Sequence, residues 1–341
     1  MRLEPPSWWY RESPTLVAKA LTPVARLVED AAAKRWSAAI PYRATVPVVC
    51  IGNFTAGGAG KTPLAICLAG LLRDAGRKPG FLTRGYGGRL SGPHTVDLAT
   101  DTARDTGDEA LLLAAMCPAV LAHDRAAGAR ALVNLGADVI VMDDGLQNPQ
   151  LAKQLSIAVL DPKRLIGNGL VLPAGPLRAN LPDQLGRTDA LVILCGGDEA
   201  MPELPLALRQ FQGPVLRAGL VADGDIAARL RGQRVVAYAG IGRPSKLFDT
   251  LRSLDADVLA EFAFPDHHLF TSAEAGRMIA RANEQRAVLV TTAKDIARTT
   301  GVRWLAELRA ASIALPVAAH FQGRDLDLIR ALLAMMLARG V

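Results

Sequence analysis

A short apolar strand followed by a glycine-rich loop constrains the fold of this chain more than any other feature of its sequence. The apolar run Val46 to Ile51 leads into Gly57-Gly-Ala-Gly60, and Lys61-Thr62-Pro63 then opens a long apolar stretch typical of a helix. Glycines adopt backbone angles that a Cβ forbids, so successive N–H groups can converge on an anion at the start of a helix. The pattern predicts a phosphate-binding loop, with Lys61 on the β- and γ-phosphates of a nucleotide and the Thr62 hydroxyl on Mg²⁺.

This loop departs in one position from the strict Walker A pattern G-x-x-x-x-G-K-[ST]. Thr55 stands where the first glycine belongs. The alternative is a glycine-rich turn with an incidental Lys-Thr pair, but the strand before the loop and the helix after it favour the phosphate-binding interpretation. The expected nucleotide-binding residues are Gly57, Gly58, Ala59, Gly60, Lys61, Thr62 and Pro63.

Length and composition set the scale of the protein. The chain has 341 residues, of which 50% are hydrophobic, so it can bury a large core and favours about two domains. Its net charge of +6 suits polyphosphate ligands, an anionic membrane and nucleic acid equally. The four cysteines lie inside apolar runs without C-x-x-C spacing, which predicts reduced core cysteines in a cytoplasmic protein.

Residues 1–43 raise the question of a membrane surface. The sequence has no stretch of about 18 consecutive apolar residues, as a spanning helix needs, and its N-terminus lacks a signal-peptide pattern. Trp8-Trp9-Tyr10 precede a basic segment, 14–36, with an apolar stripe at helical spacing: Val17, Leu21, Val24, Val28 and Ala31. The stripe is equally typical of a helix that lies on a membrane and of one that docks on its own protein.

A second apolar strand supplies the acidic residues that a phosphate loop needs. Val139-Ile-Val-Met142 runs into Asp143 and Asp144, as in a Walker B element. In a parallel sheet the carboxyl end of this strand lies beside the phosphate loop, so one carboxylate can reach the Mg²⁺ shell. Adjacent strand residues point to opposite faces, so the two aspartates should have different roles. A simple turn is the alternative; the loop upstream favours a metal site of Thr62, Asp143 and Asp144.

Two further segments carry residues that suit a ligand site. Arg84-Gly-Tyr-Gly-Gly-Arg89 places three glycines around one tyrosine, which fits either a loop pressed against a ligand or a flexible connector. Asp108 and Glu109 open a predicted helix, where carboxylates also favour the helix dipole.

The order of strands and helices predicts an α/β fold, a P-loop NTPase-type doubly wound and mostly parallel sheet followed by a second, smaller α/β unit. A proline- and leucine-rich stretch around 201–213 has little periodicity and marks the expected boundary. We therefore expect an N-terminal membrane-interface amphipathic helix at 1–43, a P-loop kinase domain at 44–213 and a smaller C-terminal α/β domain at 214–341.

Kinases, switch or motor NTPases and membrane-associated partitioning ATPases all use a phosphate loop, and the residues of this chain favour a kinase. Partitioning ATPases carry a signature lysine where this chain has Ala56, and switch GTPases carry an Asn-Lys-x-Asp motif that this sequence lacks. A non-catalytic nucleotide-dependent adaptor would not need the extra carboxylates at 105–109. His267 and His268 are consecutive and the other histidines have no partner at metal-ligand spacing, so no zinc site is expected.

Six motifs together resemble the tetraacyldisaccharide 4′-kinase family, the lipid A 4′-kinases of Gram-negative bacteria. In chain order they are Gly52-Asn-Phe-Thr-Ala-Gly-Gly-Ala-Gly-Lys-Thr-Pro63, Thr83-Arg-Gly-Tyr-Gly-Gly88, Gly107-Asp-Glu109, Asp143-Asp-Gly-Leu-Gln147, Leu172-Pro-Ala-Gly-Pro-Leu-Arg178 and Phe264-Pro-Asp-His-His268. The match runs from the N-terminal aromatic segment almost to the C-terminus.

The resemblance implies transfer of phosphate from ATP, with Mg²⁺, to the 4′-hydroxyl of an acylated glucosamine disaccharide 1-phosphate. It implies work at the cytoplasmic face of the bacterial inner membrane, as a peripheral protein with no nucleic-acid partner, and so favours the membrane interpretation of residues 1–43. Asp108 resembles the family's general base and His267 its partner, while Lys61 contacts the transferred phosphate. The expected substrate-binding residues lie in the same motifs: Asn53, Arg84, Tyr86 and Gln147.

One position departs from the family pattern. In Thr291-Thr-Ala-Lys-Asp295 the residue before the lysine is Ala293, where the family usually has glutamate. Lys294 and Asp295 remain candidates for nucleotide or interdomain contacts.

Overall fold

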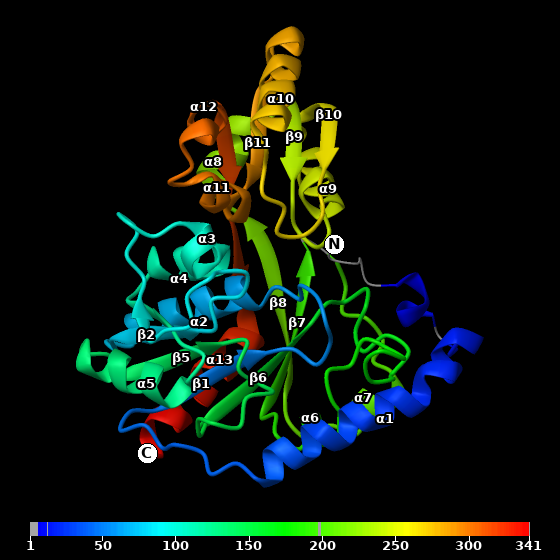
Figure 1. Cartoon of the computed structure of the whole chain (residues 1–341), viewed down its shortest axis with the longest axis vertical. Coiled ribbons are helices and arrows are strands. Elements are labelled where there is room, and N and C mark those ends of the chain that lie inside the picture. The colour runs from blue at the N-terminus through cyan, green and yellow to red at the C-terminus, as the bar shows by residue number, and fades with distance from the viewer. Residues whose placement is uncertain (1–5, 12, 197–198, 341) are drawn as a thin grey trace.

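A nine-stranded sheet forms the large lobe of the computed structural model, which describes residues 6–11, 13–196 and 199–340 (Figure 1). Its strand order is β13-β8-β7-β6-β1-β5-β2-β4-β3, and neighbours are parallel except at the pairs β13/β8 and β3/β4. The expected mostly parallel sheet is confirmed. Its strands are β1 (Val48–Gly52), β2 (Pro79–Thr83), β3 (His94–Thr95), β4 (Ala119–Leu121), β5 (Val139–Asp143), β6 (Leu155–Leu160), β7 (Ala190–Gly196), β8 (Val215–Ala222) and β13 (Val317–His320).

Helices cover both faces of this sheet, which explains why its central strands β1, β5 and β6 are mostly apolar and are buried at every position. In β1, Val49 and Ile51 pack into one core cluster, whereas Val48 and Cys50 pack into another on the opposite face. The first face is covered by α2 (Lys61–Asp74), α4 (Asp108–Ala114) and α13 (Gly323–Ala338). The second is covered by α1 (Leu16–Ser37), α5 (Arg125–Asn134), α6 (Leu181–Leu185) and α7 (Leu206–Arg209).

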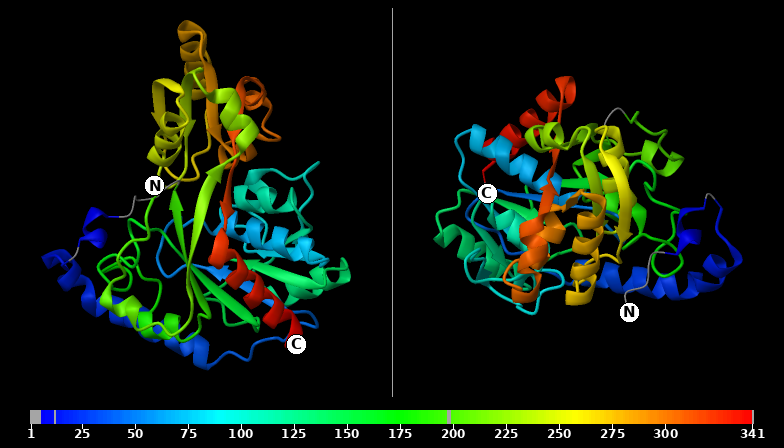
Figure 2. Two further views of the ribbon diagram at one scale, coloured as in Figure 1. Left: turned by 180° about the vertical axis from the view of Figure 1, so that it is seen from behind. Right: turned by 90° about the horizontal axis from the view of Figure 1, so that it is seen from above.

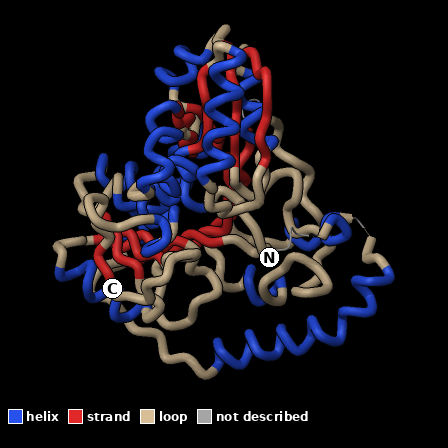
Figure 3. Tube along the Cα trace, turned by 45° about the horizontal axis from the view of Figure 1, so that its top comes forward, coloured by secondary structure: helices blue, strands red, loops and turns tan. Residues whose placement is uncertain are grey.

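The small lobe, residues 224–315, is built on a four-stranded parallel sheet of order β10-β9-β11-β12. It stands above the large sheet in Figure 1 and comes forward in Figure 3. Its elements are α8 (Gly224–Leu230), β9 (Arg234–Ala239), α9 (Ser245–Ser253), β10 (Asp257–Ala263), α10 (Ser272–Gln285), β11 (Val288–Thr292), α11 (Ala293–Thr299), η2 (Arg303–Leu305), α12 (Ala306–Ala311) and β12 (Ser312–Leu315). α9 packs on one face of the sheet and α10 on the other.

The division between the lobes differs from the expected boundary between residues 213 and 214. β8 begins at Val215 but pairs with β7 in the large sheet, and after β12 the chain returns to add β13 and α13 to the large lobe. Figure 2 shows α13, in red, lying against the large sheet. The chain therefore crosses between the lobes twice, near residues 222–224 and 315–317. The backbone N–H of Asp223 donates to the Pro316 carbonyl at 3.0 Å and joins the two crossings.

The N-terminal helix α1 packs one narrow face on the large lobe. Its buried residues are Ala18, Ala25 and Ala32, spaced seven apart, and the small alanine side chains let the helix approach closely. Of the expected stripe, Leu21 and Val28 pack against the core cluster that contains Ala25, whereas Val17 and Val24 are exposed. Residues 1–5 and 12 of the expected N-terminal segment lie outside the described residues. No helix in the described chain is both long and apolar enough to cross a bilayer.

Candidate active site

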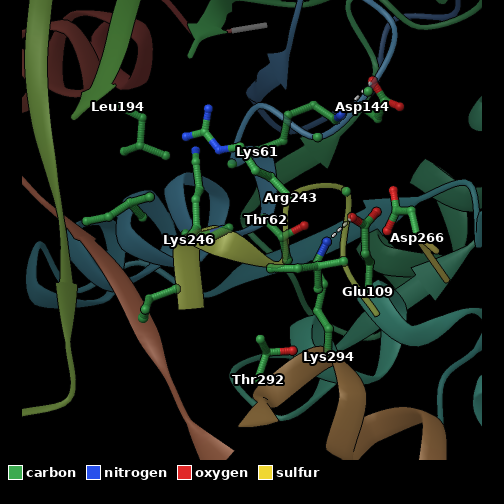
Figure 4. A pocket seen from close by; sticks show the side chains of 18 of the residues that line it. Lys61, Thr62, Glu109, Asp144, Leu194, Arg243, Lys246, Asp266, Thr292 and Lys294 are labelled. Carbon is green, nitrogen blue, oxygen red and sulfur yellow. Dashed lines mark hydrogen bonds and ion pairs between the residues drawn. The ribbon is translucent and has the colours of Figure 1, made fainter. Parts of the chain in front are cut away.

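The two lobes face each other across a cleft of about 2710 Å³. The carboxyl ends of β1 and β5 approach it from the large lobe, and the segments that follow β9 and β11 approach it from the small lobe. Figure 4 shows side chains from both lobes pointing into this space, among them Lys61, Glu109 and Lys294. Ligand sites in parallel α/β sheets lie outside the carboxyl ends of the strands, so the topology makes this cleft the candidate site.

The phosphate loop occupies the turn between β1 and α2. Gly57 and Gly60 have φ angles of 107° and 85°, which favour glycine at both positions. A Cβ at Gly60 would also lie 2.2 Å from Leu194 Cδ2, so that side chain would have to move. Lys61 and Thr62 form the first turn of α2 and are nearly buried. Of the seven expected nucleotide-binding residues, Gly57, Gly58, Gly60, Lys61, Thr62 and Pro63 line the cleft, whereas Ala59 is buried in the core.

Polar side chains stabilise the phosphate loop by hydrogen bonds to its backbone carbonyls. The Asn53 amide donates to the carbonyls of Thr55 at 2.8 Å and Gly57 at 3.2 Å. Gln147 donates to the Asn53 carbonyl at 2.8 Å, and Arg178 Nε donates to the Thr55 carbonyl at 3.0 Å. Asn53 thus supports the loop backbone, and Gln147 combines the same support with a place in the cleft wall. The motif around Arg178 stood out in the sequence, but its contact with the loop did not.

The two aspartates at the end of β5 have different surroundings, as the strand geometry predicted. Asp144 lines the cleft in a left-handed conformation, and its Oδ1 lies 2.9 Å from Arg178 Nη1 and 3.8 Å from Lys61 Nζ. Asp143 is fully buried, and neither of its carboxylate oxygens has a hydrogen-bond partner in the described part of the chain. Burial and the charge of Glu109 raise the pKa of Asp143 to about 7.

These surroundings fit a divalent cation. A buried carboxylate without a donor gains the missing partner when Mg²⁺ binds directly or through water, and Mg²⁺ sites at phosphates use one or two carboxylates together with waters. Thr62 supplies the hydroxyl that follows the phosphate-loop lysine. Asp143 and Thr62 are therefore candidates for holding the metal; Thr62 lines the cleft, and Asp143 is buried next to Asp144, which lines it.

Asp108 and His267 come together at the wall of the cleft although they are 159 positions apart in the sequence; His267 lines the cleft and Asp108 is buried behind it. Asp108 is the first residue of α4 in the large lobe, and His267, with a φ of 58°, follows β10 in the small lobe. His267 Nδ1 lies 3.3 Å from Asp108 Oδ2. The Tyr86 ring packs edge-on against the His267 ring at a centroid distance of 5.3 Å, which brings the 84–89 loop to the same point; Arg84 also lines the cleft.

Asp108 has a second partner that the sequence analysis missed. The buried guanidinium of Arg298, from α11, donates through Nε and Nη2 to Asp108 Oδ2, with 2.7 Å for the Nε contact. Burial would raise the pKa of Asp108, but the hydrogen bond from His267 and the charge of Arg298 hold it well below its usual range. Asp108 Oδ1 accepts from the Glu109 N–H at 2.9 Å. The carboxylate is therefore ionised and firmly oriented.

A second ion pair between the lobes lies beside the first. Lys294 Nζ contacts Glu109 Oε1 at 2.5 Å, as the dashed line in Figure 4 marks. Burial would lower the pKa of Lys294, but Glu109 and Asp108 hold it above its usual range. Lys294 is thus a charged interlobe contact inside the cleft. The neighbouring Ala293 also lines the cleft.

Arg125 is a further cleft residue without a signal in the sequence. It opens α5, is almost fully buried, and its Nη1 lacks a hydrogen-bond partner within the described residues. Burial lowers the pKa of its guanidinium to about 10, and Asp143 opposes this shift. An arginine at the start of a helix opposes the helix dipole and has no motif of its own, so only the structure reveals it.

Comparisons with known proteins identify the family. The family model described as tetraacyldisaccharide-1-P 4′-kinase matches residues 17–336. The chain belongs to this family. The tetraacyldisaccharide 4′-kinase of Methylorubrum populi is 51% identical and that of Rhodospirillum centenum 48%, and the matches cover 94% and 95% of this chain and 95% and 94% of those proteins. The crystal structure of the "apo" form of LpxK from Aquifex aeolicus in complex with ATP matches with a TM-score of 0.72 at 26% identity, over 94% of this chain and 100% of that one.

Membership confirms three expectations drawn from the sequence motifs: the family, the P-loop-type α/β fold, and an ATP- and Mg²⁺-dependent kinase of lipid A biosynthesis. The roles of individual side chains rest on the geometry of this chain.

Proposed function

We propose that the cleft binds MgATP on the phosphate loop and transfers its γ-phosphate to the 4′-hydroxyl of an acylated disaccharide 1-phosphate. One observation carries the proposal: a buried carboxylate of the phosphate-loop lobe, Asp108, meets a histidine of the other lobe, His267, which lines the same cleft as the loop. A hydroxyl acceptor of high pKa needs a proton acceptor as its bond to phosphorus forms.

The phosphate end of the site belongs to the first turn of α2. Lys61 neutralises charge on the β- and γ-phosphates, and the backbone N–H groups of the loop donate hydrogen bonds to the phosphate oxygens. Bound Mg²⁺ neutralises charge on the phosphate oxygens, and Thr62 and Asp143 are the side chains that hold it. Asp144 keeps Lys61 directed into the cleft through their 3.8 Å contact.

The acceptor end of the site belongs to Asp108 and His267. Asp108 Oδ2 already faces Arg298 and His267, so a sugar hydroxyl that binds there shares this oxygen with two other groups. His267 orients the carboxylate, and Asp108 takes the hydroxyl proton. Arg84, Tyr86 and Gln147 line the path to this point and bind the disaccharide.

The N-terminal segment is proposed to bring the enzyme to its lipid. Leu16, Val17, Val24 and Leu27 remain exposed on α1 beside a basic surface, the pattern of a helix at a membrane interface. Trp9 Nε1 donates to the Pro173 carbonyl at 3.1 Å, and Trp8 and Trp9 line the cleft, so the aromatic segment connects the helix to the mouth of the site. Acyl chains held in the cytoplasmic face of the inner membrane would thus enter next to the phosphate loop.

A double-mutant comparison tests the proposal. The kcat of phosphate transfer from ATP to a lipid A disaccharide precursor in mixed micelles is measured for Asp108→Ala, His267→Ala and the combination. Residues that act as one unit give strongly non-additive losses, so we expect the double variant to be about as slow as Asp108→Ala alone. His268→Ala is the matched control, because His268 contacts Glu274 at 3.0 Å outside the cleft and should retain activity.

Three outcomes would count against the proposal. Losses that multiply independently would remove the pairing, and an unchanged kcat in His267→Ala would leave Asp108 to act alone. Hydrolysis of ATP without transfer to lipid, in the wild type, would contradict the kinase assignment itself.

A further inference from the structure

The phosphate loop is flanked on its second side by another buried carboxylate. β1 lies between β5 and β6 in the sheet, with Ile51 beside Asp143 and Gly52 beside Ala158. Asp143 ends β5, and Asp161 directly follows β6, so acidic residues border the loop from both neighbouring strands. Asp161 is 7% exposed, and nothing in the proposed transfer reaction uses it.

Two cations of the small lobe neutralise Asp161. Lys246 Nζ lies 2.8 Å from Asp161 Oδ2, and Arg243 Nη2 lies 3.4 Å from the same oxygen. Both belong to the segment that follows β9, with Lys246 in the first turn of α9. In Figure 4 their side chains extend into the cleft beside Lys61 and Leu194, and Leu194 is the residue that packs on Gly60 of the phosphate loop.

Direct contacts leave the two cations poorly satisfied. They share one carboxylate, and the contacts of Arg243 with Asp161 are long, at 3.4 and 3.5 Å. The charge of Glu199 also acts on Lys246, without a direct contact. A guanidinium offers five N–H donors and an ammonium three, so one aspartate oxygen uses little of their capacity. Burial lowers the pKa of Lys246, whereas Asp161 opposes the shift. A multiply charged anion on the neighbouring loop would bind these cations better than one carboxylate does.

We propose that Arg243 and Lys246 are the small lobe's part of the nucleotide polyphosphate site, and that Asp161 holds them beside the phosphate loop until the phosphates of the nucleotide displace it. The proposal rests on nucleotide binding at the loop and adds a competition between a ligand and an internal carboxylate. Because the cations belong to the small lobe, bound nucleotide draws that lobe toward the loop. A plain interlobe ion pair has no such consequence.

Equilibrium binding of a non-hydrolysable ATP analogue with Mg²⁺, in the absence of lipid, distinguishes a nucleotide-binding role of these cations from a plain interlobe ion pair. The distinguishing result is whether each substitution weakens or tightens binding of the analogue. Lys246→Gln should weaken binding about tenfold, the contribution of roughly one charge-assisted hydrogen bond. Asp161→Asn should tighten binding several-fold, because it removes the competitor. In the Lys246→Gln, Arg243→Gln background the Asp161→Asn change should have no effect on binding, since no cation is left to release.

Controls separate binding from folding. Lys246→Arg should restore most of the affinity. Arg252→Gln, on the same helix but paired with Glu261 on the surface, should leave it unchanged. The Tm of each variant checks that the lobes remain folded. If Asp161→Asn weakens nucleotide binding as Lys246→Gln does, or if neither substitution changes it, the Asp161–Lys246 ion pair has only a structural role and the inference is wrong.

A phosphate of the lipid is the other possible occupant. If the variants alter the KM for the lipid and leave nucleotide binding unchanged, the two cations serve the 1-phosphate instead, which also overturns the inference. Failure of the wild type to bind the analogue would contradict the proposed function rather than this addition to it.

Discussion

Replacing Arg298 by glutamine should destabilise the protein strongly, because this side chain joins buried charges of both lobes. Arg298 is 3% exposed. It donates to Asp108 across the lobe interface, to Asp295 on its own helix at 2.6 Å, and to the Gly240 carbonyl at 2.5 Å. Glutamine has a similar shape at the start of the side chain but no charge, so the substitution leaves two buried carboxylates without their cation.

The expected loss follows from the burial of the pair. Removing one partner of a buried ion pair costs about 3–5 kcal/mol, because the remaining charge stays buried without compensation. An exposed pair contributes only about 0–1 kcal/mol. Arg281, which pairs with Glu284 on the surface at 3.5 Å, provides the matched arginine-to-glutamine control. We expect Arg298→Gln to lose several times more free energy of unfolding than Arg281→Gln.

The effect should also depend on pH with a defined sign. The pKa of Asp108 is depressed in the folded protein, so its contribution to stability is complete above the unfolded pKa of about 4 and is lost as pH falls toward the folded value. Without Arg298, burial favours the protonated carboxyl, which removes the unpaired charge. The difference in stability between wild type and Arg298→Gln should therefore shrink as pH falls below about 5.

Urea unfolding followed by circular dichroism and tryptophan fluorescence gives the required free energies from about pH 8 down to about pH 3. Trp304 is the tryptophan of the small lobe, so the fluorescence change includes a signal from that lobe. A loss no larger than that of Arg281→Gln, or a difference that grows as pH falls, would refute this account of the interface.

Two further predictions concern the metal and the membrane. Asp143→Asn should raise the Mg²⁺ concentration needed for half-maximal transfer, whereas Asp144→Asn should lower kcat at all Mg²⁺ concentrations because it frees Lys61. Titrating Mg²⁺ with both variants checks this, and identical titration curves would contradict the division of roles. The double variant Val24→Asp, Leu27→Asp should bind anionic vesicles less well and should raise the KM for lipid more than the KM for ATP. Its Tm should be unchanged, because both side chains are exposed. An equal rise in both KM values would contradict the membrane role.

The phosphate loop could be predicted from sequence because its determinants are local. Positive φ angles at Gly57 and Gly60 and the Lys61-Thr62 pair lie within a few residues of each other, and strand and helix patterns flank them. The pairing of Asp108 with His267 came from the family resemblance. Periodicity and spacing carry no information about a contact that joins residues of two lobes.

The arginines that complete the site could not be predicted for the same reason. An arginine in a helix pattern looks like any solvated cation until the fold shows its partner. Arg178 contacts Asp144 and Arg298 contacts Asp108, and both partners are far away in the sequence. Arg125 is buried, and the charge of Asp143 acts on it. The lobe boundary in the structure also differs from the expected boundary because of a nonlocal contact: β8 joins the large sheet and pairs there with β13.

The N-terminal helix shows the limit of a periodic pattern. The stripe of larger apolar residues in α1 left docking and membrane binding equally open. In the structure the closest approach to the body uses alanines at every seventh position instead. That arrangement leaves valines and leucines on both sides of the contact exposed, so one helix has a docked face and a free apolar face at the same time.

Side chains that hold the lobes together lie at or directly behind the wall of the cleft, which couples lobe contact to ligand binding. On one side of the cleft Asp108 and Glu109 bind Arg298 and Lys294. On the other side Asp161 binds Lys246, so carboxylates of the large lobe face cations of the small lobe at both places. In the proposed reaction, the nucleotide phosphates and Mg²⁺ bring additional charge between these pairs. Any ligand that competes for a cation or a carboxylate here must therefore change how strongly the lobes attract each other, so substrate binding and lobe position cannot vary independently in this cleft.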